Sequence, residues 1–158
     1  MNFLTEHGIS SYGELESKLT ALSARRDTAH AEIKRIESRS AELALVMKHA
    51  GTYRQLKPLY ERYRKSNDKE KFLRGHESEI ILFEAAAREL KRLGAVPLPT
   101  TESMKTELAN LNAEKERLLA EYKAARTEAQ EYETVKQNVD ALLTVPKEQE
   151  QQRRYELE

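Results

Sequence analysis

An unbroken heptad register between Leu15 and Ala50 constrains the fold of this chain more than any other feature. Alternating steps of four and three residues reach eleven positions, nine of them apolar: Leu15, Leu19, Leu22, Arg26, Ala29, Ile33, Ile36, Ser40, Leu43, Met47 and Ala50. The intervening residues are mostly charged or carry hydroxyl groups, so the pattern predicts one long helix with a narrow apolar stripe. Because such a stripe is not stable alone in water, a partner helix must cover it.

A second stripe near the other end of the chain can supply that partner. The same spacing, with one extra three-residue step, reaches Met104, Leu108, Leu111, Lys115, Leu118, Tyr122, Ala125, Ala129, Tyr132, Val135, Val139 and Leu142. The two stripes predict helices that pair antiparallel, with Leu15 near Leu142 and Ala50 near the start of the last helix. We therefore expect an all-α fold, a long antiparallel coiled-coil hairpin in which residues 51–100 form a helical tip subdomain.

Helix start and stop signals divide the chain into a lead-in, a helical domain and a tail. Residues 1–10 contain a short helical turn closed by Gly8, and Ser11 begins a capping box. The helical domain covers residues 11–143, with long helices at about 11–50 and 101–143 and tip helices at about 52–65 and 69–93. Residues 144–158 are polar and aperiodic, and we expect them to form a disordered tail.

The register changes after Ala50, because the next apolar residue, Tyr53, follows only three positions later. Gly51 and Pro58 lie in the same stretch, and proline inside a helix removes a backbone hydrogen bond. We expect the long helix to break between Ala50 and Pro58. In an alternative arrangement, residues 11–65 remain one helix of an up-down-up three-helix bundle. Its first and last helices run parallel and leave apolar surface that a dimer would cover.

The segment from Lys69 to Leu93 has the densest apolar residues in the chain, so we expect more than one of its faces to be buried. It is preceded by the cluster Ser66-Asn67-Asp68, which favours a turn and caps the following helix, and Gly94 follows it at a position that favours a helix stop. The last long helix then starts after a cap at Thr100 or Thr101.

Composition narrows the functional classes. Charged residues make up 34% of the 158, apolar ones 39%, and there is neither Cys nor Trp. This profile is typical of long helices and excludes disulfides and thiolate metal sites. The N-terminus does not resemble a signal peptide, and no stretch approaches the roughly 18 apolar residues of a membrane span. We expect a cytoplasmic protein that contacts no membrane and exists as a monomer or as a homodimer through the coiled coil.

No residue pattern indicates catalysis or cofactor binding. The four histidines, His7, His30, His49 and His76, lack the HExxH or HxH spacing of metal sites. Glycine-rich phosphate loops and nucleophile motifs are absent, and the carboxylates alternate with Lys and Arg at helical spacing, as on solvated helix faces. We expect no catalytic residue, no metal and no cofactor.

One basic segment stands out in a chain with no net charge. Eight basic and three acidic residues lie between Thr52 and Gly75, a local net charge of +5. The candidate DNA-binding residues are Arg54, Lys57, Arg62, Arg64, Lys65, Lys69, Lys71 and Arg74. Basic groups beside aromatic rings can bind phosphates and stack on bases. Two other interpretations are open. The simplest is that the tyrosines are core residues and that the basic groups are their solvated back face, and the other is that the segment binds an acidic protein partner.

Several short runs, taken in order, resemble the C-terminal helical region of relaxases, the mobilisation nucleases of bacterial plasmids and integrative conjugative elements. The resemblance covers about residues 2–143. It rests on Asn2-Phe3-Leu4-x-Glu6-His7-Gly8, Ser11-Tyr12-x-Glu14-Leu15, Tyr63-Arg64-Lys65, Lys71-Phe72-Leu73-x-x-His76-x-x-Glu79-Ile80, Leu93-Gly94, Leu98-Pro99-Thr100 and Tyr122-Lys123-x-Ala125-Arg126.

The resemblance implies a fragment of a DNA-processing protein. In that family a catalytic tyrosine and a metal held by histidines nick DNA at the transfer origin, but they belong to a preceding nuclease domain that nothing here matches. The implied function is a non-catalytic accessory domain of a conjugative relaxase, a spacer and an interaction surface for DNA or conjugation proteins. The alternative is a purely structural coiled-coil dimerisation module with no nucleic-acid role.

Overall fold

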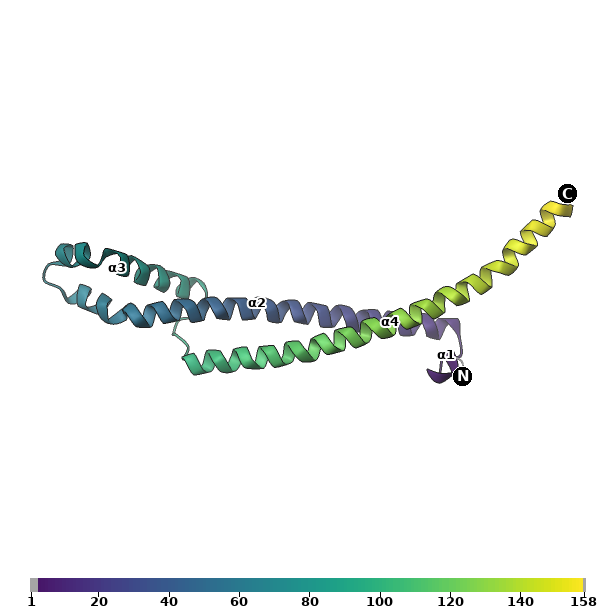
Figure 1. The fold of residues 1–158 in the computed structure, drawn as a ribbon, viewed down its shortest axis with the longest axis horizontal. Coiled ribbons are helices and arrows are strands. Elements are labelled where there is room, and N and C mark those ends of the chain that lie inside the picture. Colours follow the sequence, from purple (N-terminus) through teal and green to yellow (C-terminus); the bar gives the residue numbers. More distant parts are fainter. Residues whose placement is uncertain (1–2, 158) are drawn as a thin grey trace. The chain divides into compact units, whose positions relative to one another are not determined.

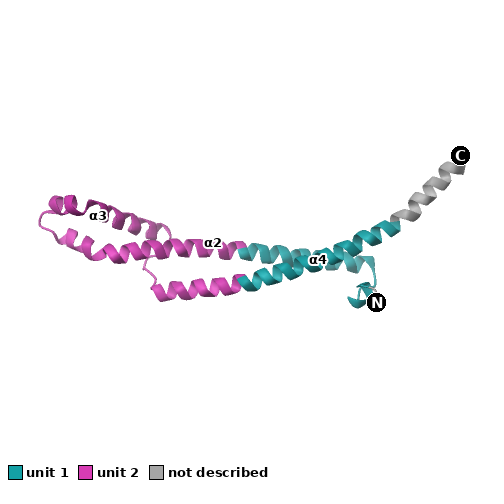
Figure 2. Ribbon diagram, viewed as in Figure 1, with its two compact units in different colours: residues 1–33, 116–158 teal, residues 34–115 magenta. Residues whose placement is uncertain are grey.

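The structure contains only helices. The computed structural model of this protein describes the backbone of residues 3–157 and the side chains of residues 3–143. All elements in that range are α-helices (Figure 1), namely α1 (Phe3–Glu6), α2 (Tyr12–Lys65), α3 (Lys69–Arg92) and α4 (Thr101–Leu157). The predicted all-α class is confirmed. The chain forms two compact units (Figure 2), unit 1 (Met1–Ile33 with Glu116–Glu158) and unit 2 (Lys34–Lys115).

The helix ends follow the local signals in the sequence. Gly8 and Gly94 adopt positive φ angles of 65° and 70°, which glycine accepts at little cost after a helix. At the starts of α2, α3 and α4, a side-chain oxygen accepts a hydrogen bond from the backbone N–H three residues later. The donors and acceptors are Glu14 N–H to Ser11 Oγ (3.2 Å), Lys71 N–H to Asp68 Oδ1 (3.1 Å) and Ser103 N–H to Thr100 Oγ1 (3.1 Å). Each of helices α2, α3 and α4 therefore begins with a side-chain cap that satisfies one of its free backbone donors.

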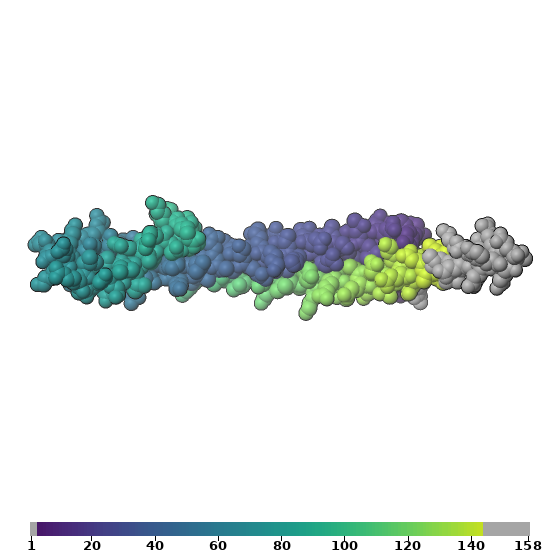
Figure 3. Space-filling model, turned by 90° about the horizontal axis from the view of Figure 1, so that it is seen from above, coloured from purple at the N-terminus to yellow at the C-terminus, as the bar shows by residue number. Residues whose placement is uncertain are grey.

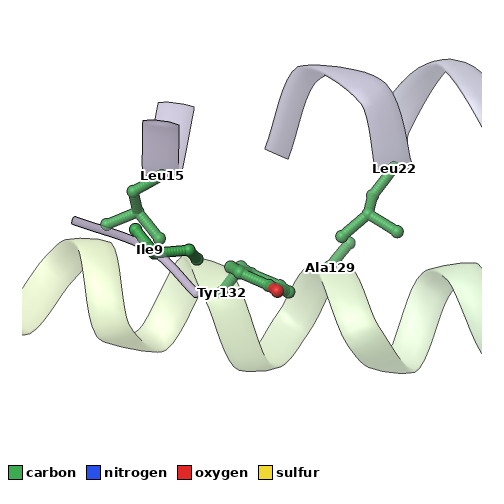
Figure 4. Packing of buried hydrophobic residues seen from close by; sticks show 5 residues of the cluster. All are labelled: Ile9, Leu15, Leu22, Ala129 and Tyr132. Atoms are coloured by element: carbon green, nitrogen blue, oxygen red, sulfur yellow. The ribbon is translucent and has the colours of Figure 1, made fainter. Parts of the chain in front are cut away.

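In unit 1 the α2 and α4 segments run antiparallel. Tyr12 donates a hydrogen bond to Asp140 at 2.8 Å, and further along α2, Arg25 lies 4.0 Å from Glu121, which is earlier on α4. The buried cluster between them consists of Ile9, Leu15, Leu22, Ala129 and Tyr132, with Leu22 directed at Ala129 and with Leu15 and Ile9 near Tyr132 (Figure 4). The predicted stripes thus form the interior of this unit.

Leu142 does not belong to the buried stripe, although the start of α2 lies beside Asp140 of α4. Leu15 is buried in the cluster that contains Tyr132, whereas Leu142 is 73% exposed. The physical reason is the length of α2, which begins at Tyr12 beside Asp140 and has no further turn to cover Leu142.

In unit 2 two helices cover α2, and both run antiparallel to it. Arg39 of α2 pairs with Glu107 of α4, while Arg54 of α2 reaches Thr101, earlier on α4. Beyond that point α3 takes over: Tyr53 and Tyr60 stack on Phe83, and Tyr63 contacts Phe72. The alternative is confirmed in one respect, because α2 (Tyr12–Lys65) keeps residues 11–65 as essentially one helix. Its parallel first and last helices are wrong, because α4 is antiparallel to α2 within each unit.

The predicted break between Ala50 and Pro58 is also wrong. Helix α2 is continuous through both glycine and proline, so the expected separate helix at residues 52–65 is its C-terminal part. The start of α4 still contacts α2 beyond the register change, because Arg54 bonds to Thr101. The apolar residues Tyr53 and Tyr60, which follow the change, stack on Phe83 of α3.

Helix α3 buries one face only. Its buried residues are Ile80, Phe83, Ala86 and Leu90. Ile81 and Leu82 remain 53% and 55% exposed, which contradicts the expectation that more than one face is covered. The dense apolar run exceeds what contact with α2 requires, because a helix that packs on one neighbour covers only one stripe.

The bounds of α4 reach Leu157, past the predicted end near residue 143. The rest of the prediction for residues 144–158, a polar disordered tail, concerns residues outside those whose side chains are described. Among the described helices, none is long and apolar enough to cross a membrane.

Candidate nucleic-acid interface

The eight candidate DNA-binding residues all belong to unit 2, and all are exposed. They follow the C-terminal half of α2, the α2–α3 turn and the first turns of α3, a surface that the space-filling view shows in teal (Figure 3). They differ in whether their cationic groups contact other atoms of the protein.

Arg54 has a structural role. Its guanidinium donates to the hydroxyl of Thr101 at 2.8 Å and to the carbonyl of Pro99, so it holds the α3–α4 connection against α2. Two of its guanidinium nitrogens therefore already bond to protein atoms. Arg54 is therefore the least suited of the eight to bind a phosphate.

Three other cations make weaker contacts within the protein. Arg74 lies 3.8 Å from Glu70 on the same helix, but both side chains are more than 80% exposed. Lys57 lies over the ring of Tyr53 at 5.9 Å, and Arg62 lies over the ring of Phe72 at 5.7 Å. The two ring contacts orient a cation without neutralising it, and an exposed ion pair such as Arg74–Glu70 is weak.

Four cations around the α2–α3 turn have no carboxylate partner among the described residues: Arg64, Lys65, Lys69 and Lys71. Together with Arg62 they form what we call the basic turn. The helix dipole explains the cations at the end of α2 but not those at the start of α3. Cations in the last turn of α2 stabilise that helix end, whereas Lys69 and Lys71 lie in the first turn of α3, where a positive charge is unfavourable.

The tyrosines of the basic segment are half-buried and pack α2 against α3. The ring of Phe83 lies between Tyr53 and Tyr60, with centroid distances of 4.8 and 4.3 Å and interplanar angles of 24° and 25°. Tyr63 contacts Phe72 at 6.0 Å. This agrees with the simplest interpretation of the tyrosines as packing residues, and it leaves phosphate contacts to the basic turn.

A groove of about 640 Å³ opens beside the stacked rings. We call it the aromatic groove; it is lined by Tyr53, Lys57, Tyr60, Glu61, Arg64, Phe83, Glu84, Ala87 and Arg88. Of the candidate DNA-binding residues, only Lys57 and Arg64 contribute to it. A smaller hollow next to it is lined by Glu61, Arg64 and Lys65, so Arg64 belongs both to the groove and to the basic turn.

The comparisons with known proteins add no relative. No protein-family model, no curated protein and no solved structure matches the chain. What this surface binds must therefore be inferred from its own residues. Where side chains are described, no group of three or more His, Asp or Glu residues lies where it could hold a metal ion.

Sequence reasoning missed the contribution of α3 to the groove. Phe83, Glu84, Ala87 and Arg88 come from the second half of that helix, outside the basic segment. Their spacing is that of one helix face, which is a usable signal. The sequence does not say, however, that this face borders Tyr60 of α2.

Proposed function

We propose that this chain is a non-catalytic helical accessory domain of a conjugative relaxase, which serves as a spacer and binds nucleic-acid phosphates through the basic turn. The resemblance of its short sequence runs to the relaxase C-terminal region supports the relaxase context. The exposed cations support the phosphate contact, because Lys and Arg side chains that neutralise phosphates supply most of the affinity of sequence-independent binding.

The observation that carries the proposal is the placement of Lys69 and Lys71. Both are exposed and unpaired within the described residues, at a helix start that disfavours positive charge. They lie beside Arg64 and Lys65 at the end of α2. These like charges do not help the helix to fold, but they would attract a polyanion.

Titration of labelled single-stranded and duplex DNA over a series of salt concentrations tests the proposal. Affinity should fall linearly with salt on logarithmic axes. Changing Arg62, Arg64, Lys65 and Lys71 together to Glu should lower affinity at least about tenfold and flatten the salt dependence.

A matched control reverses four exposed cations of unit 1: Lys18, Arg117, Lys123 and Arg126. It changes the net charge equally, so it should retain most of the affinity if the basic turn is the site. Equal losses in both variants, or no binding by the unaltered protein at low salt, would overturn the proposal.

The alternative, a structural dimerisation module, is favoured by one observation. Ile81 and Leu82 are large apolar residues that stay more than half exposed on α3. Burial of such residues at an interface stabilises association. Light scattering of the unaltered protein and of a variant with Ile81→Ser and Leu82→Ser tests this: a dimer that dissociates in the variant supports the module, and a monomer in both refutes it.

A further inference from the structure

The aromatic groove is bordered by a stack of rings, in which Tyr53 and Tyr60 of α2 both stack on Phe83 of α3. Phe83 is 6% exposed and lies in the middle, whereas Tyr53 and Tyr60 are half-buried and form the outer members. The plane of each tyrosine ring lies within 25° of the plane of Phe83. A stack with this alignment is extended by another planar ring better than by an aliphatic side chain.

The charges around the groove favour an anionic ligand. Three cations line it, Lys57, Arg64 and Arg88, against two carboxylates, Glu61 and Glu84. Ala87 also lines the groove, and its small side chain leaves space there. The groove thus combines an aromatic surface with cations at its edge, as in sites that bind a base together with its flanking phosphates.

The groove also leads directly to the basic turn. Glu61 and Arg64 line both the groove and the adjoining hollow, which Lys65 completes. A chain of phosphates held by the basic turn would therefore pass the mouth of the groove. A duplex cannot use it, because its bases are already paired and stacked.

We propose that the aromatic groove binds an unpaired base of single-stranded nucleic acid, stacked against Tyr60 or Tyr53, with the neighbouring phosphates on Lys57 and Arg64. This inference rests on the proposed function, since the basic turn supplies the phosphate contacts. It adds a preference for single strands over duplexes of the same length.

Two variants separate the groove from the basic turn. Ala87→Leu fills the groove while it keeps every ring, every charge and a strong helix former. Tyr60→Leu removes one outer ring of the stack. Ala124→Leu, at an exposed position of α4 in unit 1, and Tyr122→Leu, at a half-buried position there, are the matched controls.

The measurement is the affinity of each protein for a labelled single strand and for the corresponding duplex, over the same salt series. Both groove variants should bind the single strand about tenfold more weakly, with duplex affinity and salt slope unchanged, because loss of one stacked base costs roughly that factor. The controls should match the unaltered protein. Circular dichroism establishes that each variant is folded.

Photocrosslinking gives a readout independent of stability. A single strand that carries 5-iododeoxyuridine should crosslink to Tyr60 or Tyr53, as mapped by mass spectrometry of the peptides. Salt-dependent binding with no single-strand preference, or with crosslinks only outside the groove, would overturn the groove and leave the basic turn standing. Absence of salt-dependent binding to either DNA would overturn the proposed function itself.

Discussion

Arg39 on α2 and Glu107 on α4 form a two-pronged ion pair, with Nε 2.7 Å from Oε1 and Nη2 3.2 Å from Oε2. Each side chain is 40% exposed. The hydrogen bond to Glu107 raises the pKa of the Arg39 guanidinium. Because the planar guanidinium fits a carboxylate in one geometry, the pair specifies which turns of the two helices face each other in unit 2.

Breaking this pair should weaken unit 2 modestly. We expect Arg39→Ala and Glu107→Ala each to lower the free energy of unfolding by about 0.5–1 kcal/mol, because exposed ion pairs are screened by water. Urea unfolding of both single variants and the double variant gives the coupling energy. Arg92→Ala, which breaks a pair with Glu89 inside α3, is the control. Zero coupling between Arg39 and Glu107 would contradict a register role.

Two adjacent leucines of α4 should differ sharply in their effect on stability. Leu118 is 7% exposed and Leu119 is 43% exposed. We expect Leu118→Ala to cost about 2–4 kcal/mol through lost burial and the cavity that it leaves. Leu119→Ala should cost less than about 1 kcal/mol. Chemical unfolding followed by far-UV circular dichroism measures both, and similar losses would show that α4 packs through a different face.

Tyr12 should ionise at unusually high pH. Its hydrogen bond to Asp140 favours the neutral phenol and raises the pKa of Tyr12 from 10.0 to about 12. A raised pKa means that the contact is fully stabilising below pH 10 and is lost as the pH rises through about 12. Absorbance titration of tyrosinate should therefore lose a late step in Tyr12→Phe.

Asp140→Asn tests the same contact from the other side. It removes the negative charge beside Tyr12, so Tyr12 should ionise at lower pH in the absorbance titration. Tyr132, whose pKa is also raised by burial, remains in both variants. An unchanged titration curve in Tyr12→Phe would contradict the assignment.

Replacing the proline inside α2 should stabilise the protein. Pro58 has no N–H to donate to the backbone carbonyl of Arg54, and its ring disfavours a straight helix. We expect Pro58→Ala to raise the free energy of unfolding by about 1–3 kcal/mol. Gln55→Ala, also exposed, should change it little. A loss of stability in Pro58→Ala would mean that α2 needs the proline to reach α3.

Local chemistry was readable from the sequence at the ends of helices. Gly8, Asp68, Gly94 and Thr100 act through their own φ angle or through a hydrogen bond to a residue three positions away, so nothing distant is needed to recognise them. The two apolar stripes were readable for the same reason, because a helical period is a local pattern.

The basic turn could be predicted in part from the sequence, and the groove could not. The cations lie close enough along the chain to be counted as one charged segment. That count did not separate Arg54, which holds the α3–α4 connection, from Lys69 and Lys71, which remain accessible. Only the tertiary contacts make that distinction. Phe83 and Ala87 become part of a site because α3 folds back on Tyr60.

The amino-acid sequence by itself determined the all-α class, the starts of the long helices, and most of the apolar stripe that each of them buries. The tertiary structure decided which partner covers each part of α2. After Ala50 a three-residue step rotates the apolar stripe, and whether such a step breaks a helix depends on what lies opposite. Here Phe83 of α3 stacks on Tyr53 and Tyr60, and that packing keeps α2 continuous where glycine and proline alone would favour a break.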